Sequence, residues 1–323
     1  MNATTCIEPR DSRSAIFPAR DFDLAATLNS GQAFRWNFQD NGWNGVIGNR
    51  WVRLRGDEFS VTAQMAEPVA DWNWLKNYLQ TDLDFHAILS SFPDDEPMRA
   101  AKIACRGLRL LRQEPWECLA SFILSSTKQI VQIRQIVSLL CERFGEPVSA
   151  LPEYAPAFAF PTPERLARAT EAELRACKMG FRAPYLSGSA RAIAGGQFDL
   201  ERLRALPVEM ARAELMKLPG VGRKIADCVL LFAYGFPTAF PVDVWILKAL
   251  RRLYFPKRRV SPKRLLHFSE THFGPNAGYA QQYLFHYVRV ANKFSGSEFK
   301  VQGSMNRPRA KNSKIKIQKS QIP

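Results

Sequence analysis

The sequence of 323 residues is long enough for one large domain or two moderate domains, each with its own hydrophobic core. Hydrophobic residues make up 46% of it, which fits a globular protein and excludes a disordered chain. The formal net charge of +15 indicates a polyanionic partner, for which nucleic acid is the first candidate and an anionic membrane surface the second.

The N-terminal part of the chain is predicted to form a small domain built on antiparallel strands. Residues 1–20 show no regular pattern and are predicted to be irregular. Short strand-like runs follow, and two of them, 51–56 and 58–63, alternate apolar and polar residues as a half-buried antiparallel sheet does. A helical run at 71–80 closes the unit, so we expect an antiparallel, β-rich domain over residues 21–97.

From residue 98 onward the pattern is helical almost without interruption. Successive runs with helical periodicity are bounded by Pro, Gly or Ser, which predicts a helical domain over residues 98–292 and an α+β fold that is mostly α. Residues 293–323 carry eight Lys or Arg and one Glu without an apolar period, and are predicted to form a disordered basic tail. The tail either adds affinity for phosphates or is dispensable.

Cysteine spacing and the N-terminus indicate the compartment. The six cysteines form no C-x-x-C pair and match no zinc or iron–sulfur spacing, so we expect reduced thiols and no metal site. Residues 1–17 lack the apolar core of a signal peptide, and no stretch approaches 18 apolar residues. We therefore expect a soluble, intracellular monomer without membrane association, in the cytoplasm and nucleoid or in a eukaryotic nucleus.

Residues 218–228, LPGVGRKIADC, place Lys224 directly behind a Gly-x-Gly turn. A P-loop needs Ser or Thr after its lysine and a dinucleotide fingerprint needs a third glycine, and Ile225 occupies both positions. A hairpin between two helices remains, in which Gly220 and Gly222 can adopt positive φ and let a phosphate approach the backbone amides. A plain tight turn between helices is the alternative.

The segment after the hairpin favours a chemical role for its lysine. Apolar residues from Ile225 onward recur at helical spacing, so this helix packs on a core. Lys224 opens the helix at its positive end, which disfavours a cation and makes the amine a candidate nucleophile. Asp243, in the segment PVDV, either caps the next helix or presents a carboxylate to the lysine.

The hairpin and the PVDV segment resemble the helix-hairpin-helix and Gly/Pro-Asp signature of the base-excision DNA glycosylases, whose bifunctional members carry a lysine at this position. Four further segments, in matching order and spacing, are similar to those of the 8-oxoguanine DNA glycosylase family: 30-SGQAFRW-36, 107-GLRLLRQEPWECLASFILSS-126, 179-MGFRAPYLSGSARAI-193 and 274-GPNAGYAQQYLF-285. The resemblance covers roughly residues 21–290. It implies a TBP-like sheet domain followed by a helical glycosylase domain.

The resemblance implies an enzyme that flips 8-oxoguanine out of double-stranded DNA, cleaves its N-glycosidic bond through a lysine Schiff base and nicks the strand by β-elimination. Lys224 would attack the anomeric carbon, and Asp243 would stabilise the cationic sugar. The backbone carbonyl of Gly31 would accept the N7–H that only the oxidised base carries. No cofactor is implied, although a structural ion is compatible with the main-chain carbonyls of Met216, Leu218 and Val221.

Further residues are implied around the flipped base. Gln281 would form hydrogen bonds with its Watson–Crick edge, while Phe285 and Cys228 would stack on its two faces. From the local pattern alone, Phe285 and Cys228 are ordinary core residues. By the same resemblance Pro241 lines the pocket, and Asp243 also contacts the substrate.

Contacts with the DNA outside the pocket complete the implied site. Phe181 matches a wedge residue, and Arg182 matches an arginine used at the vacated site of the opposite strand. The whole DNA-binding set is Thr127, Gln132, Phe181, Arg182, Gly220, Gly222 and Trp245. The chain departs from the usual family residues at Thr127, Lys128, Gln129, Gln132, Phe181 and Trp245. The first four of these contact the base opposite the lesion in the family.

Two other functions are compatible with parts of the pattern. One is a related bifunctional glycosylase for another damaged base, but relatives that act on pyrimidine lesions usually carry a four-cysteine cluster and lack a strand-rich N-terminal unit. The other is a non-catalytic helix-hairpin-helix DNA-binding protein. It accounts for the charge but not for Lys224, Asp243 and Gln281 occurring together.

Overall fold

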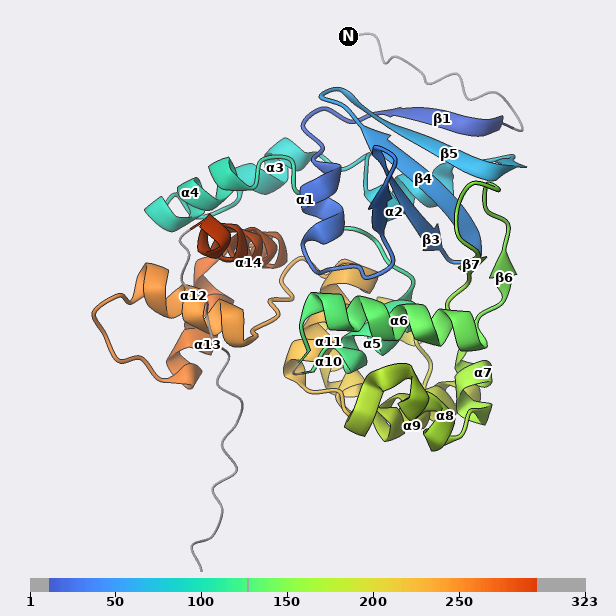
Figure 1. Cartoon of the computed structure of the whole chain (residues 1–323). Coiled ribbons are helices and arrows are strands. Elements are labelled where there is room, and N and C mark those ends of the chain that lie inside the picture. The colour runs from blue at the N-terminus through green and yellow to red at the C-terminus, as the bar shows by residue number, and fades with distance from the viewer. Residues whose placement is uncertain (1–11, 127, 295–323) are drawn as a thin grey trace, which may run out of the picture.

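The structure, a computed structural model, describes residues 12–126 and 128–294, and side chains up to residue 290. Thr127 and the tail residues 295–323 lie outside the described residues, as do residues 1–11. An antiparallel sheet precedes a helical unit, which confirms the predicted α+β fold that is mostly α (Figure 1). Within the described ranges, no helix is long and apolar enough to cross a membrane.

The sheet has five antiparallel strands in the order β1-β5-β4-β3-β2. They are β1 (Ser12–Pro18), β2 (Asn37–Gln39), β3 (Gly42–Ile47), β4 (Arg50–Gly56) and β5 (Ser60–Val69). The presence of β1 corrects the prediction that residues 1–20 are irregular, because residues 12–18 pair with β5. Ala15 and Phe17 point into the core as alternation requires, but the apolar Ile16 between them is 63% exposed. An apolar residue on the solvent face conceals the alternation in the sequence.

Two helices complete the sheet unit. α1 (Leu24–Asn29) is capped by Asp23, whose carboxylate accepts a hydrogen bond from the Ala26 N–H at 2.8 Å. α2 (Asn73–Leu79) lies within the predicted helical run at 71–80. It brings Tyr78 to Trp36, whose indole N–H donates to the Tyr78 hydroxyl at 2.9 Å. The buried indole thereby satisfies its polar group while its rings fill the core.

The helical unit contains the remaining helices. They are α3 (Phe85–Ser90), α4 (Glu96–Ala104), α5 (Pro115–Leu124), α6 (Ile130–Phe144), α7 (Pro163–Arg168), α8 (Glu171–Leu174), α9 (Ala183–Ala194), α10 (Val208–Leu215), α11 (Arg223–Val229), α12 (Val244–Tyr254), α13 (Pro262–His272) and α14 (Ala277–Phe294). Short helical turns are η1 (Arg175–Met179), η2 (Gly180–Arg182), η3 (Glu201–Ala205) and η4 (Leu230–Tyr234), and β6 (Pro147–Val148) pairs with β7 (Ala157–Phe158).

The boundary between the two units differs from the prediction at residues 97 and 98. Phe85 and Phe92 already pack with the core of the helical unit, although they precede that boundary. α3 and α4 accordingly lie beside α14 in Figure 1 and not on the sheet. The pattern that is helical from residue 98 onward is first interrupted after α4, which ends at Ala104. Gly107 then has a φ of +82°, which does not fit a helix.

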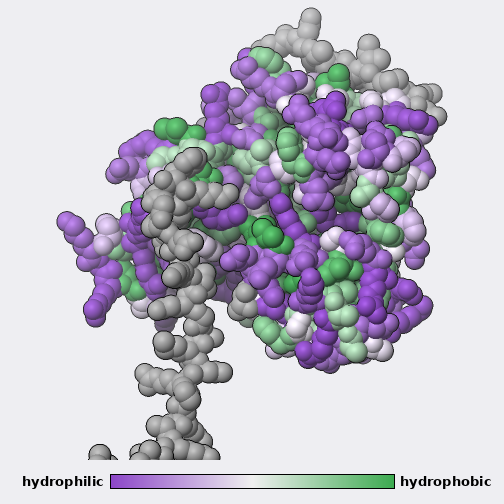
Figure 2. Space-filling model, in the orientation of Figure 1, coloured by the Kyte–Doolittle hydropathy of each residue, from purple (hydrophilic) through white to green (hydrophobic). Residues whose placement is uncertain are grey.

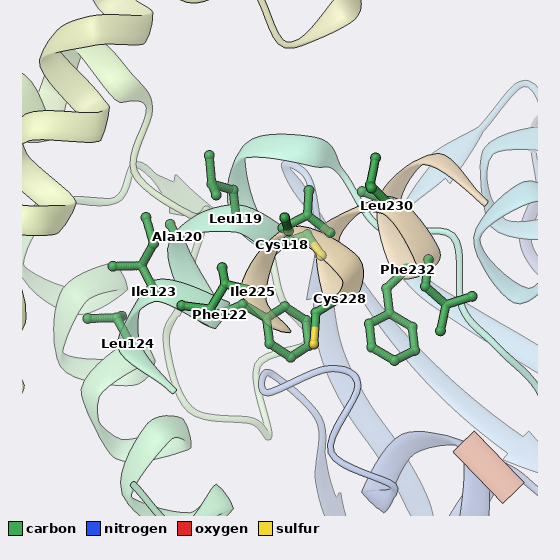
Figure 3. Close-up of a cluster of buried hydrophobic side chains, with 14 of the residues drawn as sticks. Cys118, Leu119, Ala120, Phe122, Ile123, Leu124, Ile225, Cys228, Leu230 and Phe232 are labelled. Carbon is green, nitrogen blue, oxygen red and sulfur yellow. The ribbon is translucent and has the colours of Figure 1, made fainter. Parts of the chain in front are cut away.

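The core of the helical unit is centred on α5 and α11. Apart from its partly exposed Glu117, every residue of α5 is buried, and Ile225 and Cys228 of α11 pack among them (Figure 3). The rings of Phe122 and Phe232 stack with centroids 5.5 Å apart. Hydrophobic residues on the face seen in Figure 2 are scattered among hydrophilic ones, so the apolar packing lies mainly inside. Lys224 thus lies in the first turn of a helix whose position is determined by a close-packed core.

Candidate active site

The hairpin predicted at residues 218–228 joins α10 to α11. Gly220 has a φ of +76°, and a Cβ there would lie 2.8 Å from Cβ of Tyr185, so both conformation and space require glycine. Gly222 does not use the positive φ that glycine allows: its φ is −93°, it is the N-cap of α11, and a Cβ there would meet no atom within 4 Å. Only one of the two glycines therefore needs its conformational freedom, and the free amides of the first turn of α11 follow directly.

A buried ion pair holds the two hairpin helices together. Arg212 of α10 donates from Nε to Oδ1 of Asp227 in α11 at 2.6 Å, and both side chains are less than 10% exposed. Burial raises the pKa of Asp227 to about 6, while the charge of Arg212 and its hydrogen bond oppose this shift. Arg223 also faces Asp227, and it pairs with Glu270 of α13 at 2.6 Å. The orientation of α11 thus depends on charges as well as on apolar packing.

Lys224 projects from the first turn of α11 toward the end of α5. Its Nζ donates a hydrogen bond to Oγ of Ser125 at 3.0 Å and lies 5.1 Å from the centroid of the Phe122 ring. The Ser125 hydroxyl in turn donates to the Phe122 carbonyl at 2.7 Å, which fixes its direction. Cys228, one turn after Lys224, forms a side-chain hydrogen bond with it. Burial raises the pKa of the Cys228 thiol to about 12, so the thiol is neutral despite the nearby cation.

Asp243 combines both roles that its sequence position allowed. It is the N-cap of α12, and its Oδ1 accepts a hydrogen bond from the Ile246 N–H at 2.8 Å. It also interacts electrostatically with Lys224 and with Arg289. Burial raises the pKa of the Asp243 carboxyl, and the backbone amides and the two cations oppose that shift. Pro241, two residues earlier, is buried.

Gly31 lies in a loop whose shape is set by the neighbouring Gln32. Gly31 has a φ of +86°, and a Cβ there would lie 2.5 Å from Cδ1 of Ile130. The fully buried Gln32 amide donates to the Thr27 carbonyl at 2.9 Å and to the Arg109 carbonyl at 2.8 Å, and it accepts from the Leu111 N–H at 2.8 Å. These bonds tie the loop to the segment that precedes α5.

α14 presents Gln281, Phe285 and Arg289 at successive four-residue intervals, which places them on one face of the helix. Gln281 is 4% exposed, and its Oε1 has no hydrogen-bond partner among the described residues. The Arg289 guanidinium lies 5.3 Å from the centroid of the half-buried Phe285 ring and donates to the Ser30 carbonyl at 3.1 Å. The face of α14 therefore borders both the Gly31 loop and Asp243. An unpaired buried amide oxygen in this place indicates a site for a hydrogen-bond donor.

Four of the predicted DNA contacts show how exposure varies around this site. Phe181 is 53% exposed, whereas Arg182 is 2% exposed and donates to the carbonyls of Met179 and Ser126. Two carbonyls thus hold the Arg182 guanidinium inside in this structure, and its contact with DNA stays a prediction. Gln132 is exposed, and Trp245 is half-buried. Thr127 lies outside the described residues.

Two smaller points concern the predicted contacts. The Gln132 side chain accepts a hydrogen bond from the Gln129 N–H at 3.0 Å, so it also caps α6. Of the carbonyls considered for a structural ion, that of Leu218 accepts a hydrogen bond from the Val221 N–H at 3.2 Å. That carbonyl retains one free lone pair.

Two residues of the site were missed by sequence reasoning. Ser125 lies in a quoted segment but gives no local signal for a bond to Lys224, which is 99 residues away. Arg289 had such a signal, because it follows Phe285 by four residues on the helix that also carries Gln281.

A groove of about 1190 Å³ lies elsewhere, between β5 and the beginning of α5. Its lining includes Glu67, Glu114 and Arg165, but none of the predicted site residues. The candidate site is therefore defined by its polar contacts and not by this groove.

The comparisons with known proteins agree with this geometry. Residues 14–119 match the family model "8-oxoguanine DNA glycosylase, N-terminal domain", and residues 120–273 match "HhH-GPD superfamily base excision DNA repair protein". The chain is 31% identical over 286 residues to "N-glycosylase/DNA lyase OGG1" of Arabidopsis thaliana, covering 82% of this chain and 77% of that protein. It is 33% identical over 258 residues to "N-glycosylase/DNA lyase" of Saccharomyces cerevisiae, covering 72% and 68%.

A solved structure is similar over nearly the whole chain. It is the 8-oxoguanine glycosylase/lyase of Clostridium acetobutylicum in complex with double-stranded DNA containing cytosine opposite 8-oxoG. The TM-score is 0.83 at 31% identity, and the match covers 90% of this chain and 100% of that one.

The ion pair between Arg212 and Asp227 gives a test of the hairpin scaffold. Arg212→Met leaves Asp227 buried without its main partner, so we expect a loss of about 3–5 kcal/mol in the free energy of unfolding at pH 8. Urea denaturation measures it. Lys217→Met is the matched control, because Lys217 pairs with Glu214 in the same hairpin with 65% of its side chain exposed, and its loss should stay below about 1 kcal/mol. Equal losses in the two variants would contradict a structural role for the buried pair.

Proposed function

The chain belongs to the 8-oxoguanine DNA glycosylase family of helix-hairpin-helix base-excision repair proteins, and on that premise we propose that it excises 8-oxoguanine from duplex DNA and then cleaves the strand. The observation that carries the proposal is the placement of Lys224. Lys224 lies in the first turn of α11, and its amine donates a hydrogen bond to Ser125 and interacts electrostatically with the carboxyl of Asp243. A nucleophile and a carboxylate are the two groups that the reaction needs.

Lys224 begins the reaction as a free amine, after its proton has passed to solvent or to a nearby base. Its lone pair forms a bond to C1′ of the lesion nucleotide, and the C1′–N9 bond breaks with its electron pair going to the departing base, which takes up a proton. The C1′–O4′ bond then breaks with its electron pair going to O4′, which takes up a proton, and the opened sugar is left as a protonated imine on Lys224. The carboxylate of Asp243 stabilises the positive charge that develops on the sugar.

Strand cleavage follows from the imine. Loss of a proton from C2′ shifts electrons toward the nitrogen, and the C3′–O bond breaks with release of the phosphate. Water then hydrolyses the imine and returns the Lys224 amine. This is covalent catalysis, in which one amine serves both steps. We propose that the reaction needs no cofactor, because the lysine and the carboxylate supply its nucleophile and its charge stabilisation.

Recognition of the base is assigned to the loop and to α14. 8-Oxoguanine differs from guanine by an oxygen at C8 and a hydrogen on N7. The Gly31 carbonyl accepts that N7–H, and the unpaired Oε1 of Gln281 accepts a donor from the Watson–Crick edge. Phe285 stacks on one face of the base, and Cys228 and Pro241 contact the other side. With guanine the Gly31 carbonyl stays buried without its partner, which disfavours the undamaged base.

We assign binding of the duplex to the hairpin and to the exposed residues near it. The amides after Gly220 and Gly222 bind backbone phosphate without reading sequence. Phe181 occupies the space that the flipped base leaves, and Gln132 faces the opposite base. Trp245 stands where the family often has a histidine that contacts a phosphate near the lesion. The protein acts as a monomer on intracellular DNA.

The nucleophile is tested by trapping. Borohydride reduces an imine to a stable amine, so incubation with an 8-oxoguanine duplex and borohydride should cross-link the chain to DNA. Lys224→Gln should abolish the cross-link, because it keeps a polar, slightly shorter side chain and removes the amine. Gel electrophoresis of labelled duplex measures the adduct. Lys217→Gln, an exposed lysine of the same hairpin, is the control and should leave trapping unchanged. A folded wild-type chain that neither cross-links nor nicks this duplex would exclude the proposed function.

The role of Gln281 is tested by discrimination. Gln281→Ala removes a buried acceptor for the lesion's edge, so the preference for 8-oxoguanine over guanine duplex should fall by about 5- to 100-fold. Binding to undamaged duplex should change little, because phosphate contacts dominate it. Competition binding with both duplexes measures the two effects. Equal losses on lesion and undamaged DNA would show that Gln281 is merely structural.

A further inference from the structure

Two arginines from different helices hold the segment that carries Gly31. Arg134 of α6 donates from Nη2 to the Leu28 carbonyl at 3.3 Å and to Oδ1 of Asn29 at 2.8 Å. Arg289 of α14 donates to the Ser30 carbonyl at 3.1 Å. The last two residues of α1 and Ser30 are thus bound at three consecutive positions just before Gly31.

Arg289 makes further contacts that Arg134 does not share. Its guanidinium lies 5.3 Å from the centroid of the Phe285 ring, and a Cβ on Gly31 would lie 3.5 Å from its Nη1. It also interacts electrostatically with Asp243. One planar cation therefore borders the loop, the stacking ring and the carboxylate of the candidate site.

The charge of Arg289 is incompletely compensated. Burial lowers its pKa, the nearby Arg134 acts in the same direction, and Asp243 opposes them. Within the described residues, no carboxylate lies within 4.0 Å of its guanidinium. A half-buried cation without a close counter-ion lowers the stability of the folded state, so its contribution to folding does not explain its presence. Its position beside the Gly31 loop and Asp243 fits a role in the site.

We propose that Arg289 is a positioning residue for lesion recognition, which sets the distance between the Gly31 carbonyl and the Phe285 ring and directs a positive charge at Asp243. The inference rests on the proposed function, since it concerns the same site. Binding of a base between a carbonyl and a ring depends on their separation to within about 0.5 Å. The Arg289 guanidinium lies over the Phe285 ring and donates to the carbonyl of Ser30, the residue before Gly31, so it limits that separation. The planar guanidinium suits this task because it stacks and donates at once.

The charge of Arg289 has a separate consequence for Asp243. The groups that face this carboxyl are Lys224 and Cys228 from α11, Arg289 from α14, and the amides of Trp245 and Ile246 in α12. Burial raises the pKa of Asp243, and the charges of Lys224 and Arg289 lower it. If one of these two charges is removed, the pKa of Asp243 rises. The reaction needs the carboxylate, and activity falls as the pH falls through that pKa. Removing the charge therefore moves the acid limb of the pH–rate profile to higher pH.

The test compares three full-length variants by single-turnover excision across a range of pH. Arg289→Met keeps much of the apolar stem but loses the charge and the bond to Ser30, so discrimination between 8-oxoguanine and guanine should fall about five- to tenfold and the acid limb should move to higher pH. Arg289→Lys should return the acid limb to its wild-type position and recover discrimination only in part.

Arg134→Met is the matched control. It releases the same segment at Leu28 and Asn29, so it should reduce discrimination. The acid limb should stay in place, because Arg134 is not among the groups that contribute most to the shift of the Asp243 pKa. An equal shift of the acid limb in both methionine variants would overturn the proposal, because it would show that both substitutions act by making the site less rigid. Unchanged discrimination in Arg289→Met would also overturn it.

Two outcomes separate this inference from the function on which it rests. If the wild-type chain excised no 8-oxoguanine, the proposed function would fail. If wild-type and Arg289→Met excised it with the same discrimination and pH profile, only the role of Arg289 would fail. Circular dichroism establishes whether each variant is folded. If Arg289→Met does not fold, the pH profile of Arg289→Lys provides the test. That variant keeps the positive charge, so a shift of its acid limb would contradict the proposal.

Discussion

The Lys224 ammonium lies at the positive end of α11, where the helix dipole disfavours a cation, and the rest of the site is arranged around that constraint. Ser125 accepts its hydrogen bond, the Phe122 ring lies near it, and Asp243 supplies a negative charge. These partners come from the end of α5 and the start of α12, so the amine is compensated only while three helices keep their positions. The stacked core between α5 and α11 and the Arg212–Asp227 ion pair fulfil this requirement.

The Gly31 loop and Asp243, for which we propose roles in recognition and in chemistry, are distant in the chain and meet at α14. The Gly31 loop belongs to the sheet unit, yet Gln32 binds it to the segment before α5, and Arg289 binds it to α14. Since α3 and α4 also pack on the helical core, the two units are joined along the chain and not only at one linker. An active site divided between them therefore has a rigid base on both sides, as a specific base pocket requires.

The sequence was most informative where the relevant physics is local. The Gly220 turn, the N-cap at Asp243 and the four-residue spacing of Gln281 and Phe285 each depend on a few neighbouring residues, and the structure has all three. The predicted fold class and the family resemblance are likewise confirmed.

Predictions failed where distant contacts decide. Strand β1 was missed because an apolar residue faces solvent at Ile16. The sequence also could not show that the guanidinium of Arg182 points inward, because this depends on a carbonyl 56 residues away. Residue type allowed positive φ at Gly222, but as an N-cap it needs only extended backbone. The bond from Arg289 to Ser30 spans 259 residues, so no local pattern could establish it.

The most direct measurement of the central claim is the site of attachment in the borohydride-trapped adduct. The cross-linked protein is digested with nuclease and trypsin, and the peptides are analysed by mass spectrometry. Trypsin cleaves after Arg223 but not after a modified lysine, so the account predicts a sugar remnant on the peptide from Lys224 to Lys248. A remnant on another lysine or on the N-terminal amine, with Lys224 unmodified, would contradict it.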